Sequence, residues 1–127
     1  MKTRHTILVV DNEPGLCHVL KKALGREGYQ VLTASTGRRA LTLLKKGKID
    51  LLLLDLKMPG LGGLDILREL RKGSSKKVVP PTVVLTAYGS LSSAREAMEL
   101  GVVDYLTKPF DLDVVKKAVA EALEDQR

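Results

Sequence analysis

Short runs of apolar residues alternate five times with segments of helical periodicity, and this alternation constrains the fold more than any other feature of the sequence. Alternating strands and helices predict a parallel sheet with helices on both of its faces. The expected strands cover residues 6–10, 31–34, 49–54, 82–86 and 104–106. The expected helices cover residues 14–27, 38–46, 64–72, 91–100 and 112–124.

The run Leu51-Leu52-Leu53-Leu54 is apolar at every position, which is typical of a strand buried on both faces. Right-handed crossovers leave few topologies for such a chain. We expect an α/β fold with a doubly wound five-stranded parallel sheet in the order 2-1-3-4-5, a flavodoxin-like (βα)5 arrangement. Residues 1–127 fit a single domain of this size.

Composition excludes several classes of protein. Hydrophobic residues make up 44% of the chain and charged residues 28%, as in a folded soluble domain, so we expect a cytoplasmic protein without a membrane segment. The net charge is +6, but the basic residues are scattered and aromatic residues are only 3%, which argues against direct nucleic-acid binding. The single cysteine, Cys17, rules out an internal disulfide and fits a packed helix position.

Polar and charged residues follow the carboxyl ends of the expected strands. In an open α/β sheet, ligands bind at this edge, where the strand order reverses. The residues that the topology brings there are Asp11, Asn12 and Glu13 after the first strand, Asp55 after the third, Thr86 at the end of the fourth, and Lys108 after the fifth.

These residues suggest a phosphoryl-acceptor site. Two carboxylates about 4 Å apart repel by about 4 kcal/mol at an effective dielectric near 20, so Asp11 and Asp55 favour a bound cation. Mg²⁺ is the cation that suits oxygen ligands near phosphate. Lys108 and Thr86 supply an ammonium and a hydroxyl for phosphoryl oxygens, and a carboxylate such as Asp55 can serve as the nucleophile.

Four stretches carry a family resemblance: residues 7–14, 50–63, 83–89 and 97–110. They contain an Asp-x-x-Met-Pro-x-x-x-Gly element that starts at Asp55 and a Lys-Pro-Phe element that starts at Lys108. Over nearly its whole length the chain resembles the receiver domains of two-component response regulators. From Leu85 onward it is most similar to receivers of enhancer-binding transcription activators.

The resemblance implies a role for each matching residue. Asp55 would accept a phosphoryl group from a histidine kinase or phosphotransfer protein, and Lys108 would contact that group. Thr86 would move inward to bond it, and Tyr105 would follow. Mg²⁺ would be held by Asp11, Asn12, Asp55 and the backbone carbonyl of Lys57.

The resemblance also implies that Lys57 and Tyr88 tune the rate of phosphoryl loss and that the Lys108–Pro109 peptide bond is cis. The face formed by residues 91–124 would change its fit to an output partner, or to a second copy of the chain. Such a domain promotes its own phosphorylation and dephosphorylation but is not an enzyme with a separate substrate. No effector follows Arg127 in this sequence, so the output partner is not defined by it.

One position departs from the family pattern, because receivers usually carry two adjacent acids after the first strand and here the second is Asn12. We expect weaker Mg²⁺ binding and altered phosphorylation rates, with Glu13 pointing away from the site. A pseudo-receiver with impaired phosphorylation is the alternative. A haloacid-type phosphatase is disfavoured because Asp55-Leu-Lys lacks a second acid, and a flavodoxin-like cofactor binder because Asp11-Asn-Glu-Pro is acidic.

Overall fold

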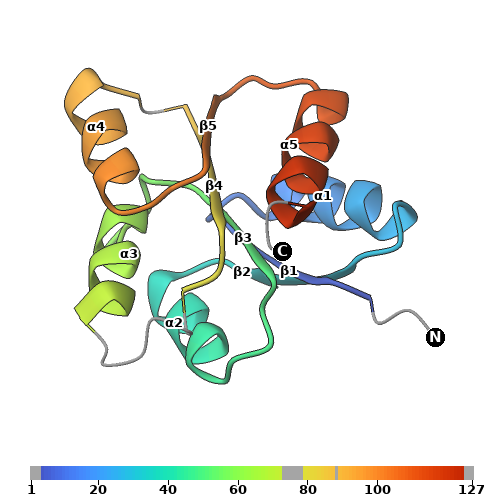
Figure 1. The fold of residues 1–127 in the computed structure, drawn as a ribbon, viewed down its shortest axis with the longest axis horizontal. Coiled ribbons are helices and arrows are strands. Elements are labelled where there is room, and N and C mark those ends of the chain that lie inside the picture. Colours follow the sequence, from blue (N-terminus) through green and yellow to red (C-terminus); the bar gives the residue numbers. More distant parts are fainter. Residues whose placement is uncertain (1–3, 73–78, 88, 125–127) are drawn as a thin grey trace.

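The computed structural model describes residues 4–72, 79–87 and 89–124. Within these residues five parallel strands form one sheet in the order β2-β1-β3-β4-β5 (Figure 1), which confirms the predicted topology. Parallel pairing joins β1 to both β2 and β3, so the strand order reverses between β1 and β3. The strands are β1 (Thr6–Val10), β2 (Gln30–Ala34), β3 (Leu51–Leu54), β4 (Thr82–Thr86) and β5 (Asp104–Thr107).

Helices cover both faces of the sheet (Figure 1). One face packs against α1 (Pro14–Arg26) and α5 (Leu112–Glu124). The opposite face packs against α2 (Gly37–Lys45), α3 (Gly63–Lys72) and α4 (Leu91–Glu99). Among these helices, none is long and apolar enough to cross a membrane.

The core is divided by the sheet into two clusters, and β3 contributes to both. Leu52 and Leu54 pack on the side of α2, α3 and α4, whereas Leu51 and Leu53 pack on the side of α1 and α5. All four side chains are at most 1% exposed, as the uninterrupted apolar run predicts for a strand covered on both faces.

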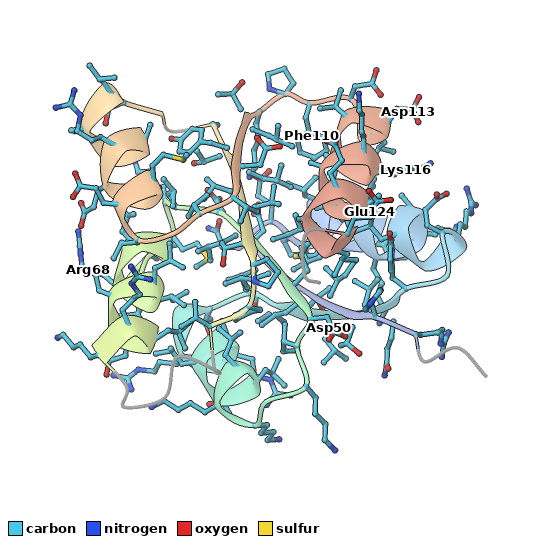
Figure 2. All side chains as sticks on the ribbon, in the orientation of Figure 1. Asp50, Arg68, Phe110, Asp113, Lys116 and Glu124 are labelled. Atoms are coloured by element: carbon cyan, nitrogen blue, oxygen red, sulfur yellow. The ribbon has the colours of Figure 1, made fainter. Side chains whose placement is uncertain are left out.

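The start of β3 differs from the prediction, because the strand begins at Leu51 and not at residue 49. Gly47 and Lys48 both have positive φ angles, of 68° and 104°, so the chain turns immediately before the strand. Asp50 then pairs with Thr6 in two ways: its carboxylate accepts the Thr6 N–H at 2.7 Å, and its own N–H donates to the Thr6 carbonyl at 2.8 Å. Figure 2 labels Asp50 at this point of the sheet.

Candidate functional site

The predicted charged residues meet at the carboxyl edge of the sheet. Asp11 directly follows β1, where its N–H donates to the Ala34 carbonyl of β2 at 3.1 Å. Asp55 directly follows β3, where its N–H donates to the Val10 carbonyl of β1 at 3.0 Å. Both carboxylate residues are buried, at 2% and 6% exposure, although ionised groups are rarely buried without a partner.

The partner of both carboxylates is Lys108. Its Nζ lies 2.6 Å from Asp11 Oδ2 and 3.3 Å from Asp55 Oδ2, and the lysine side chain is only 12% exposed. The residue is held in place by its N–H, which donates to the Thr86 carbonyl at 3.0 Å. The bond between Lys108 and Pro109 is cis, the conformation that the family resemblance implied.

Burial and ion pairing shift the pKa values of Asp11 and Lys108 in opposite directions. Burial raises the pKa of Asp11, and hydrogen bonds from Lys108 and from the Glu13 N–H offset only part of that rise. Burial lowers the pKa of Lys108, but the hydrogen bond and charge of Asp11, followed by the charge of Asp55, outweigh it, so the pKa is raised. Lys108 is therefore a cation throughout the physiological pH range.

Glu13 lies closer to the site than its sequence position suggested. We expected this side chain to point elsewhere, but Glu13 Oε1 is 3.2 Å from Lys108 Nζ. Asn12, which the resemblance implied as a Mg²⁺ ligand, is exposed. The ammonium of Lys108 bonds Asp11, Glu13 and Asp55.

The loop after β3 fixes the backbone around Asp55. The N–H of Lys57 donates to Asp55 Oδ1 at 3.2 Å, which leaves Oδ2 directed at Lys108. Gly63 begins α3 against the backbone of Asp55, because a Cβ added there would lie 2.5 Å from the Asp55 carbonyl oxygen and 2.9 Å from Leu56 Cα. Only glycine permits such a close approach of two backbone segments.

Thr86 and Tyr105 lie on the adjacent strands β4 and β5. Thr86 is completely buried, and its partner across the β4–β5 pair is Thr107. Tyr105 is partly buried, but its hydroxyl is fully covered and has no hydrogen-bond partner among the described residues. A Cβ added at Gly89 would lie 3.3 Å from this hydroxyl. The predicted tuning residue Tyr88 lies outside the described residues.

Mg²⁺ is compatible with the donors that the site offers. The ammonium of Lys108 already stands as a cation between Asp11 Oδ2 and Asp55 Oδ2, so this position is built for positive charge. In the described part of the chain no group of three or more His, Cys, Asp or Glu side chains has the geometry of a metal site. Two carboxylates, completed by a carbonyl and water, are the donor set that Mg²⁺ commonly takes.

Fold and site together define a class: a doubly wound α/β domain whose buried carboxylates and lysine meet where the strand order reverses. Residues 7–120 match the response regulator receiver domain family, and the chain belongs to this family. It is 38% identical over 117 residues to sporulation initiation phosphotransferase F of Bacillus subtilis, covering 92% of each chain.

Two further proteins illustrate the range of the family. The transcriptional regulatory protein GlrR of Escherichia coli is 40% identical over 120 residues, which cover 93% of this chain but only 26% of GlrR. This chain is also 38% identical in sequence to response regulator protein TrrA from Thermotoga maritima, whose crystal structure is a complex with Mg²⁺-BeF. It superposes with a TM-score of 0.81 over 94% of this chain and 99% of TrrA. The chain is thus a two-component response-regulator receiver domain, and such domains occur both nearly alone and within longer regulators.

Proposed function

We propose that Asp55 accepts a phosphoryl group from a histidine kinase or phosphotransfer protein. The observation that carries this proposal is the buried Asp55 carboxylate, with Asp11 beside it and one lysine bonded to both. An oxygen of Asp55 attacks the phosphorus of a phosphohistidine, the P–N bond breaks as the new P–O bond forms, and the imidazole leaves. Hydrolysis of the resulting acyl phosphate by water releases orthophosphate and restores Asp55.

The other residues of the site stabilise the added charge. Lys108 offers N–H donors to the phosphoryl oxygens, and the hydroxyl of Thr86 supplies another after it moves inward. Asp11, Asp55 and the Lys57 carbonyl would hold Mg²⁺, which would supply positive charge against the negative charge of the transferred group. Lys57 and Tyr88 are proposed to shield the acyl phosphate from water, and so to set its lifetime.

The proposed response is a rearrangement of the face formed by α4, β5 and α5. Phosphorylation adds close to two negative charges at Asp55, which draws Thr86 and Lys108 towards it and frees space for Tyr105. Large apolar side chains are exposed on and next to this face, at Leu91 (77%), Met98 (56%), Val103 (50%) and Val114 (49%). We propose that this face binds the output partner or a second copy of the chain, as a module of a transcription regulator or of a phosphorelay.

Acetyl phosphate with Mg²⁺, followed by intact-mass measurement, tests the acceptor. The wild-type chain should gain one phosphoryl group, the Asp55→Ala variant none, and the Asp113→Ala variant, which removes an exposed acid on α5, the same as wild type. Labelling that persists in Asp55→Ala would rule out Asp55 as the acceptor.

A pseudo-receiver with impaired phosphorylation is the second candidate function, because Asn12 stands where receivers usually carry a second acid, and Asn12 is exposed. Labelling should then be absent in the wild-type chain and appear in Asn12→Asp. A Mg²⁺ titration of both chains measures the same difference as affinity, and equal affinities would show that Asn12 does not weaken the site.

A further inference from the structure

The ammonium of Lys108 is shared by three carboxylates, one for each of its N–H donors. The distances from Nζ are 2.6 Å to Asp11, 3.2 Å to Glu13 and 3.3 Å to Asp55. Asp11 and Asp55 are buried, whereas the side chain of Glu13 is 63% exposed. Glu13 is therefore the partner with room to move together with the lysine.

The oxygens that hold Lys108 are also the ones that a divalent cation would take. Lys108 then loses its contacts with Asp11 Oδ2 and Asp55 Oδ2, yet its largely covered ammonium still requires a charged partner. Glu13 Oε1 is the remaining carboxylate in contact with it. We propose that Glu13 is a positioning residue, which keeps Lys108 at the carboxyl edge when Mg²⁺ displaces it from the two aspartates.

The charge of the cluster supports this role. Three carboxylates and one ammonium sum to −3 + 1 = −2, which a divalent cation neutralises, whereas without Glu13 the sum is −2 + 1 = −1. Glu13 thus supplies the charge that the neutral Asn12 does not. In this proposal Glu13 acts through its contact with Lys108 and is not itself a ligand of the metal.

The test is the affinity of the unphosphorylated chain for Mg²⁺, measured by calorimetry. Glu13→Gln should bind about two- to fivefold more weakly, the range expected for losing one partly exposed charged contact. Glu13→Asp keeps the charge but withdraws the carboxylate by one methylene, so it should also bind more weakly. Glu121→Gln removes an equal charge beside Val103 and Asp104, at the amino end of β5, and should bind as wild type.

A second readout follows the lysine itself. In Mg²⁺-saturated wild type the NMR signal of the Lys108 side-chain Cε should stay distinct from those of solvent-exposed lysines, and in Glu13→Gln it should move towards them. Unchanged affinity in Glu13→Gln or Glu13→Asp, or an equal loss in Glu121→Gln, would overturn the proposal.

This inference rests on the Mg²⁺ part of the proposed function, and the acetyl-phosphate assay separates the two. If the wild-type chain is phosphorylated but the Glu13 variants bind Mg²⁺ as tightly as wild type, the proposed function stands and the role of Glu13 is wrong. If the wild-type chain neither binds Mg²⁺ nor gains a phosphoryl group, both the proposed function and the role of Glu13 are wrong.

Discussion

Arg68 on α3 binds Glu96 on α4 through two nitrogens of its guanidinium group, Nε at 2.7 Å and Nη2 in a closer contact. Figure 2 labels Arg68 on α3. Its Nη1 also bonds Asp65 at 3.0 Å, and Asp65 Oδ2 accepts the Gly62 N–H at 3.1 Å. A continuous chain of hydrogen bonds therefore joins the loop that follows Asp55 to α4, the helix expected to move.

We predict that Arg68→Ala loosens α4 in the unphosphorylated chain. Both side chains are well exposed, so global stability should change little, but amide hydrogen exchange within α4 should speed up several-fold. Exchange in α1 should stay the same. The control is Lys116→Ala, whose ion pairs on α5 are long, at 3.9 and 4.0 Å, and should leave α4 unaffected. Unchanged exchange in α4 of Arg68→Ala would mean that the ion pair does not restrain this helix.

The buried charge of Asp11 should lower stability at neutral pH. Its pKa is raised in the folded state, mainly by burial, so the folded chain holds a proton more tightly there than the unfolded chain does. The cost of the charge is then fully present above the folded pKa, and it is relieved as pH falls through that value towards the unfolded one.

Asp11→Asn should therefore raise the free energy of unfolding at pH 7 by about 1 kcal/mol, a common size for a single substitution, in the absence of divalent cation. Urea titrations across pH 4 to 7 measure this, and the difference between the variant and wild type should shrink as the pH is lowered. A difference that grows in acid would show that the pKa of Asp11 is shifted the other way.

Gly63→Ala should directly disturb Asp55, the proposed acceptor. The new methyl group would meet the backbone of Asp55 and Leu56, which cannot rotate away, so we expect a loss of about 2 kcal/mol in the free energy of unfolding and slower phosphorylation. Gly25→Ala is the matched control. It lies within α1, with nothing within 4 Å of its added Cβ, and should stabilise the chain by about 0.5–1 kcal/mol.

Removal of the Tyr105 hydroxyl should not destabilise the unphosphorylated chain. A buried hydroxyl without a hydrogen-bond partner carries a desolvation cost of about 1–3 kcal/mol, so Tyr105→Phe should be neutral or more stable in thermal unfolding. A clear loss of stability would indicate a partner that the described residues do not include. The same variant, compared before and after phosphorylation, reports whether the hydroxyl acquires a partner in the switched state.

Much of the fold could be predicted because its signals are local and repeated. Five apolar runs and five helical patterns fix the elements, and the rules for parallel sheets then place Asp11, Asp55, Thr86 and Lys108 at one edge. The first residue of β3 was missed because it depends on the positive φ of Lys48, which a lysine seldom adopts.

The direction of Glu13 could not be predicted from its neighbours. Adjacent residues usually point to different sides, and this rule placed Glu13 away from the site. The orientation of Glu13 is set by the ammonium of Lys108, which lies 95 residues further along the chain. This ammonium comes close to Glu13 only once the sheet has formed. The orientation of a side chain that is held by a charge far away in the sequence therefore cannot be predicted from the local sequence pattern.

The helix α4 buries only Ala97 completely, whereas α1, α2, α3 and α5 each bury three or more residues. Most side chains of α4 are thus not fully buried in the core. Substitutions at its outward residues, such as Leu91 and Met98, can accumulate without loss of the scaffold. Because α4 belongs to the proposed binding face, changes in this one helix can alter the choice of partner while the residues at the carboxyl edge of the sheet stay the same.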